Sequence, residues 1–205
     1  MAIRKFSTAS VSAGSNKSTK LWDQETFARD FEAIATAVVD SSGASTITFS
    51  SIPQIYKDLQ VRYMARTTRS SSDGDYMRFR FNSDTTNNYS SQHWYGGDGS
   101  GVTASYDGAT GPGIYVERIT AASQASNVYG IGIVDILDYK STNKTKVLKY
   151  FTGADVNGAF NTYSIRQGSG MWLTTDTAIS SITINAGVGP NFTQYSHFAL
   201  YGLRG

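Results

Sequence analysis

Apolar and polar residues alternate along much of this chain, and the alternation is clearest in two neighbouring segments. In residues 76–82, Met77, Phe79 and Phe81 fall on one side of a period-two pattern, with two arginines on the other side. Residues 59–67 alternate in the same way, and the segment between the two is rich in serine, aspartate and glycine. Such alternation is typical of strands with one face in a core and the other in water. With turn-forming residues between them, the two segments predict a central β-hairpin.

Further short strands are predicted on both sides of this hairpin, with turn signals between them. They include residues 31–39, 160–165 and 171–174. Residues 128–137 are apolar on both faces, which predicts a central strand buried on both sides. Residues 96–113 contain seven glycines and show no period, so a long loop is expected there. The whole pattern is typical of an all-β protein, a jelly-roll-like antiparallel β-sandwich of about ten strands.

The first 25 residues differ from the rest of the chain. They are mostly small and polar, and their basic residues come before any acidic residue. A segment with so little apolar surface does not fold on its own. We therefore expect an extended N-terminal arm over residues 1–25 and one β-sandwich domain over residues 26–205. An arm folded back on its own domain is the alternative interpretation. The arm residues expected to contact a partner are Arg4, Lys5, Lys17, Lys20 and Trp22.

Composition narrows the range of partners and locations. Charged residues make up 17% of the chain, below the roughly 25% typical of soluble domains, so hydroxyl and amide groups are expected on its surface. Such a surface suits an extracellular protein or one on the outside of a particle. The net charge of +2 is too small to predict nucleic-acid binding. There is no cysteine and no apolar run near the roughly 20 residues of a membrane-spanning helix, so neither disulfides nor membrane insertion is expected.

Several segments, in order along the chain, resemble parts of structural proteins of tailed bacteriophages: residues 48–62, 78–84 with 88–90, 179–184 and 198–203. These proteins are described as tail-fibre-like, head-decoration or minor virion proteins, and they contain a jelly-roll domain. The resemblance implies a non-enzymatic protein of the virion. It also implies a homo-oligomer, for which a trimer is one form, with other virion proteins of the capsid or tail as partners. No catalytic residue is carried over from it, and neither a cofactor nor a metal is predicted.

Four arginines lie on the polar sides of the two strands of the predicted hairpin. If the strands pair, their guanidinium groups come close together and form a basic surface that could dock onto an acidic partner such as a capsid shell. Pairing with acidic residues across the strands is an equally simple interpretation. The four residues are Arg62, Arg66, Arg78 and Arg80.

Residues for catalysis are scarce. Only two histidines occur, His93 and His197, which limits any triad of the serine-hydrolase type. A carboxylate pair for glycoside hydrolysis would have to come from residues such as Asp135 and Asp138, which are as easily explained as strand and strand-end residues. Asp135 lies on an apolar strand and is expected to need a hydrogen-bond partner. The sequence therefore predicts no catalytic site.

Two functions follow from these observations. The first is a head decoration or cement protein attached to the particle through the N-terminal arm. The alternative is a tail-fibre or appendage protein that binds host-surface carbohydrate through aromatic side chains near the glycine-rich segment. Aromatic residues of β-proteins more often belong to the core, which is the competing interpretation of these positions. The candidate carbohydrate-binding residues are His93, Trp94, Tyr95 and Trp172.

Overall fold

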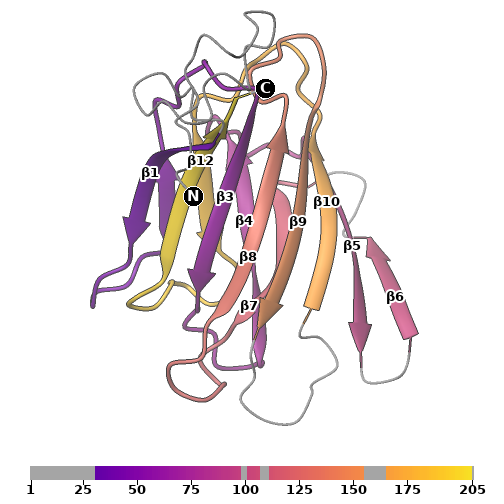
Figure 1. The fold of residues 1–205 in the computed structure, drawn as a ribbon. Helices are drawn as coiled ribbons and strands as arrows, with labels where there is room; N and C mark the ends of the chain where they lie inside the picture. Colours follow the sequence, from indigo (N-terminus) through magenta and orange to yellow (C-terminus); the bar gives the residue numbers. More distant parts are fainter. Residues whose placement is uncertain (1–30, 98–100, 107–110, 155–164, 205) are drawn as a thin grey trace, which may run out of the picture.

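The computed structural model describes residues 31–97, 101–106, 111–154 and 165–204. These residues form twelve strands in two antiparallel sheets that pack face to face (Figure 1). The predicted N-terminal arm, and with it the five arm residues named above, lies outside the described residues, as does most of the predicted strand at residues 160–165.

The two sheets differ in width. In spatial order, the larger sheet contains β1 (Phe31–Val38), β12 (His197–Leu203), β3 (Asp58–Ala65), β8 (Gly130–Leu137), β9 (Lys146–Ala154), β10 (Ile165–Trp172), β5 (Tyr89–Gly97) and β6 (Gly101–Tyr106). The smaller sheet contains β2 (Thr46–Phe49), β11 (Ile182–Ala186), β4 (Gly74–Phe81) and β7 (Ile114–Thr120).

Eight of the strands have jelly-roll connectivity. If β1, β2, β3, β4, β7, β8, β11 and β12 are counted from one to eight, the sheet orders are 1-8-3-6 and 2-7-4-5. This is the arrangement of a jelly roll, in which successive strands alternate between the two sheets except for the fourth and fifth, here β4 and β7, which pair in one sheet. The pairs β5–β6 and β9–β10 are insertions, and both extend the larger sheet beyond β8. The prediction of a jelly-roll-like antiparallel β-sandwich is therefore confirmed.

The core lies between the two sheets and consists of the inward-facing residues of both. Leu59 and Val61 on β3 are fully buried, as are Met77, Phe79 and Phe81 on β4. The polar residues between them face away from the core, as the period of two predicted. The alternation thus identified correctly which side of each strand is buried.

The predicted central hairpin is wrong. β3 pairs with β12 and β8 in the larger sheet, whereas β4 pairs with β11 and β7 in the smaller sheet. The chain between β3 and β4 therefore crosses from the larger sheet to the smaller one. The apolar side of each of these strands packs against the opposite sheet. The buried carboxylate of Asp75 stabilises this crossing: it accepts hydrogen bonds from the Thr67 hydroxyl at 2.8 Å and from the amides of Val188 and Gly189 at 2.9 Å each.

Two further elements differ from the predictions because of glycines. The glycine-rich segment at 96–113 is not one loop, since β6 lies within it. β10 extends over residues 165–172 rather than 171–174, and its inward positions at Gly168 and Gly170 are glycines. A side chain at Gly168 would overlap the ring of Tyr150, so the glycine is needed for the large neighbour. Because glycine has no side chain, glycines at inward positions add nothing to the apolar pattern, so the buried side of this strand cannot be recognised from the sequence.

The outer edge of the smaller sheet is covered by side chains of the larger sheet. The Thr152 hydroxyl on β9 donates a hydrogen bond to the Glu117 carbonyl on β7 at 2.8 Å. The Tyr115 amide on β7 donates to the Ser91 hydroxyl on β5 at 3.0 Å. An ion pair between Arg166 on β10 and the Glu117 carboxylate, at 3.2 Å, lies beside them. The inserted strands therefore provide hydrogen-bond partners for backbone groups of β7 that would otherwise be unpaired at the edge of the sheet.

We expect Thr152→Val to lower the free energy of unfolding by about 1–3 kcal/mol, because it leaves the part-buried Glu117 carbonyl without its donor while preserving the shape of the side chain. Urea denaturation followed by far-UV circular dichroism measures this loss. Thr48→Val on the exposed side of β2 is the matched control and is expected to change stability by no more than about 0.5 kcal/mol. Equal effects of the two substitutions would contradict a stabilising role for this hydrogen bond.

Candidate functional site

The four arginines predicted to form one basic surface do not lie together. Arg62 is on the outer face of the larger sheet, whereas Arg78 and Arg80 are on the smaller sheet. Arg66, just beyond β3, is buried with 8% of its surface exposed. The prediction of a shared surface is wrong because β3 and β4 belong to different sheets.

Arg66 has a structural role. Its guanidinium donates hydrogen bonds to four backbone carbonyls of the connection between β7 and β8, at distances of 2.7 to 3.0 Å. A planar group with five donors suits such a set of acceptors, and a lysine could not replace it. The carbonyls belong to Ala122, Gln124, Ala125 and Val128.

The other three arginines also contact groups of their own chain. The Arg80 guanidinium donates to the Pro112 carbonyl at 2.7 Å, and that of Arg78 lies 5.3 Å from the centre of the Tyr115 ring. Arg62 donates to the Gln60 side chain at 2.7 Å, and its guanidinium lies over the ring of Tyr201. These contacts favour the interpretation as local pairing over that of a basic docking surface.

Trp172 belongs to the core and is not an exposed platform for a sugar. Only 2% of its surface is exposed, and its indole N–H donates to the Asp84 carboxylate at 2.8 Å. The ring stacks on that of Tyr89, and the Lys146 ammonium lies 5.4 Å from its centre. Burial raises the pKa of Tyr89 to about 12 and lowers the pKa of Lys146 below its ordinary value. The prediction that Trp172 binds carbohydrate is therefore wrong, and its role is packing.

The other three candidate carbohydrate residues are consecutive, so they do not share one face of β5. His93 is buried, and its Nε2 lies 2.8 Å from the Arg166 guanidinium. That guanidinium also lies over the ring of Tyr95, 4.6 Å from its centre, on the same side of β5 as His93. Trp94 points to the opposite, outer side and is 40% exposed. His93 and Tyr95 thus form part of a polar cluster with Arg166 and Glu117, while Trp94 faces outward.

A shallow hollow of about 260 Å³ lies next to Trp94 on the β5–β6 hairpin. Gln92, His93, Trp94, Ala104 and Ser105 line it. A second hollow of about 310 Å³ lies further along the same sheet, where its lining includes Ser90, Gln92, Ser169 and Met171. Small polar side chains and amides beside an exposed indole are groups that bind sugars in proteins. Of the four candidate carbohydrate-binding residues, Trp94 therefore remains a candidate.

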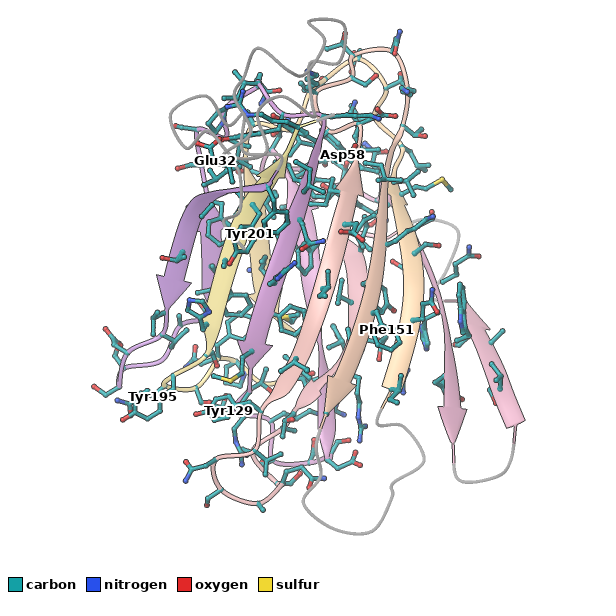
Figure 2. The ribbon with its side chains drawn as sticks, in the orientation of Figure 1. Glu32, Asp58, Tyr129, Phe151, Tyr195 and Tyr201 are labelled. Carbon is teal, nitrogen blue, oxygen red and sulfur yellow. The ribbon has the colours of Figure 1, made fainter. Side chains whose placement is uncertain are left out.

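The largest feature that the sequence prediction missed is a set of exposed apolar side chains in two neighbouring rows on the outer face of the larger sheet. They come from six adjacent strands, β3, β8, β9, β10, β5 and β6, and each is 40–74% exposed. Figure 2 labels one of them, Phe151, on β9. We call this set the apolar outer face. It consists of Met64, Ile131, Ile133, Phe151, Ile165, Trp94 and Val102.

The sequence did contain a signal for this face. Residues 128–137 are apolar on both sides, which predicts a strand that is buried on both sides. In the structure β8 has one buried side, which includes Val134 and Ile136, whereas Ile131 and Ile133 on the other side are 60% and 41% exposed. The chain itself covers only one side of β8 within the described residues, so the prediction of a doubly buried strand is wrong for the single chain.

Polar residues border the apolar outer face on the side of Gln60. The Gln60 amide donates to the Asp135 carboxylate at 2.7 Å, so Asp135 has the hydrogen-bond partner that the sequence predicted for it. Lys149 is directly opposite Asp135 in the pairing of β8 with β9. Asp135 and Lys149 therefore lie in one row next to the apolar rows.

The described residues contain no group of three or more histidine, cysteine, aspartate or glutamate side chains arranged to hold a metal ion. They also contain no helix that is long and apolar enough to cross a membrane.

Comparisons with known proteins identify no family for this chain. No family model and no curated protein matches it. Among solved structures, it is similar to the crystal structure of the Emp47p carbohydrate recognition domain, with 12% sequence identity, coverage of 86% of this chain and 90% of that chain, and a TM-score of 0.28. A likeness at this level has no bearing on function, and the fold assignment rests on the order of strands in the two sheets.

We expect Trp172→Ala to lower the free energy of unfolding by about 3–5 kcal/mol, because it opens a cavity between the sheets and removes the donor to Asp84. Trp94→Ala is the matched comparison and is expected to cost about 1 kcal/mol or less, since its ring is partly in solvent. Urea denaturation followed by far-UV circular dichroism measures both losses. Similar losses for the two variants would contradict the placement of Trp172 in the core and Trp94 at the surface.

Proposed function

We propose that this protein is a non-enzymatic structural component of a bacteriophage virion, and that it is a head decoration protein attached through its N-terminal arm. Its work in this role is to make protein–protein contacts. The observation that carries the proposal is the apolar outer face, seven side chains that lie side by side on one sheet and remain exposed in the single chain. Exposed apolar areas of this kind mark surfaces that another molecule covers.

The positions of the phage-like segments support the same proposal. Residues 48–62 include the end of β2 and most of β3, and residues 78–84 include the second half of β4. Residues 179–184 include the start of β11, and residues 198–203 belong to β12. In space, β4, β11 and β2 are neighbours in one sheet, and β12 and β3 are neighbours in the other. The resemblance therefore falls mainly on neighbouring strands of the jelly roll, while residues 88–90 lead into the inserted strand β5.

Deleting residues 1–20 is expected to abolish attachment to phage particles while leaving the β-sandwich folded, because the deleted segment contains few apolar residues. Immunogold electron microscopy of particles incubated with the protein measures attachment, and label over the head is the expected result for the full chain. Unchanged circular dichroism and melting of the truncated protein provide the folding control.

Replacing Arg4, Lys5, Lys17 and Lys20 together with glutamine separates the charge of the arm from its length. Loss of attachment in this variant would show that the contact is electrostatic, and such a contact should also weaken at high salt. A truncated protein that still coats heads would refute the role of the arm. Label confined to the tail of particles would refute head decoration and favour the second function below.

The second candidate function is carbohydrate binding by a tail fibre or appendage protein. Trp94 favours it, because this indole is exposed and lies beside a hollow lined with polar groups.

Trp94→Ala is expected to abolish retention of the protein on host-surface polysaccharide if carbohydrate binding is the function, because the stacking ring is removed. Affinity electrophoresis in gels that contain the polysaccharide measures retention. Ile55→Ala, at another exposed apolar position, is the control and is expected to bind like the unmodified protein. Absence of retention of the unmodified protein would exclude this function for the polysaccharide tested.

A further inference from the structure

The apolar outer face is continuous across neighbouring strands. Ile133 is directly opposite Phe151 in the pairing of β8 with β9, and Met64 is directly opposite Ile131 in the pairing of β3 with β8. Directly opposite residues of an antiparallel pair lie on the same side of the sheet and about 5 Å apart. These four side chains therefore form the centre of one surface rather than isolated exposures.

The surface continues towards the free end of the sheet. Gln167 on β10 is opposite both Phe151 and Trp94, and Ile165 lies one position further along the same side of β10. Ile165 is thus diagonal to Phe151 and to Trp94, a spacing at which large side chains still touch. Val102 on β6 is diagonal to Trp94 in the same way.

The apolar outer face is larger than the largest exposed apolar patch of a typical monomeric protein. The largest exposed apolar patch of a monomeric protein is typically about 300–600 Å². Seven large apolar side chains, each 40–74% exposed, together present on the order of 700 Å². One partner of a standard protein–protein interface buries about 800 Å². The face therefore has the size of one side of a stable interface.

The charges around this face favour a second copy of the same chain as its occupant. The apolar side chains lie in two neighbouring rows of paired residues that run across the sheet. Among the paired residues of these rows in the described strands, Arg62 alone carries a permanent charge. Its guanidinium is held over the rings of Phe31 and Tyr201, 4.8 and 5.5 Å from their centres, on the side away from Ile131. A nearly uncharged surface can cover an identical surface without burying an unpaired charge.

We propose that two copies of this chain associate through their apolar outer faces, with the larger sheet of one copy stacked on the larger sheet of the other. Packed sheets lie about 10 Å apart, which lets Ile131, Ile133 and Phe151 of the two copies interdigitate. Asp135 and Lys149 lie at the border, where a rim stays hydrated. The proposal deepens the proposed structural function, because it names a partner and the surface that binds it.

The proposal predicts that the purified full-length chain is an oligomer in solution and that a charge at the centre of the face disrupts it. Size-exclusion chromatography with multi-angle light scattering, over a range of micromolar concentrations, measures the mass. Ile131→Glu and Phe151→Glu are each expected to reduce the mass to that of one chain, because association would bury an unpaired carboxylate. Both side chains are largely in solvent in the single chain, so its circular dichroism spectrum should stay the same.

Ile55→Glu is the matched control, because Ile55 is 58% exposed, close to the 60% of Ile131, but lies in the connection between β2 and β3. This variant is expected to keep the oligomeric mass. If Ile131→Glu does not fold, Phe151→Glu decides the result, and it is expected to be a folded single chain.

Three results would overturn the proposal. The first is an unmodified protein with the mass of a single chain at all concentrations. The second is an oligomer that both glutamate variants leave intact, which would place the contact elsewhere. The third is a single chain in solution whose attachment to particles is lost in Ile131→Glu, which would mean that a different virion protein covers the face. An oligomer that labels no particle would instead contradict the proposed function and leave this inference standing.

Discussion

The edge of the smaller sheet is the constraint on which much of this structure depends. β7 ends that sheet, and its backbone groups are satisfied by the hydroxyls of Thr152 and Ser91, which come from the larger sheet. The ion pair between Glu117 and Arg166 adds a charged contact at the same place. Because a buried backbone group without a partner costs about 1–3 kcal/mol, these contacts determine where the inserted strands lie over β7.

The unequal width of the two sheets then explains the two unusual surfaces of the molecule. Four strands cannot cover eight, so β5 and β6 extend past the smaller sheet, as Figure 1 shows. Where the cover ends, the inner side becomes polar, with His93 close to Arg166. The outer side of the same sheet has no cover among the described residues, yet it carries Ile131, Ile133 and Phe151. An apolar face in this position is consistent with a protein built to make contacts with another protein.

The candidate sites show why patterns along a chain are weak evidence for the grouping of side chains. The consecutive strands of Arg66 and Arg78 predict a shared surface, but β3 and β4 belong to different sheets of the jelly roll. His93, Trp94 and Tyr95 are adjacent in sequence, and for that reason Trp94 cannot face the same way as its neighbours. Trp172 lies on the same buried side of β10 as Gly168 and Gly170. Because these glycines contribute no apolar side chain, the sequence does not show that Trp172 belongs to the core.

The sequence by itself determined the all-β class and the inward side of β3 and β4, because a period of two is a local property. Only the tertiary structure decided which strands pair, since the same alternating segment fits beside many neighbours. It also decided that Ile131 and Ile133 face outward, because an apolar residue is buried only where another layer covers it. Whether such a layer exists depends on the number of strands in the opposing sheet, which no single segment encodes.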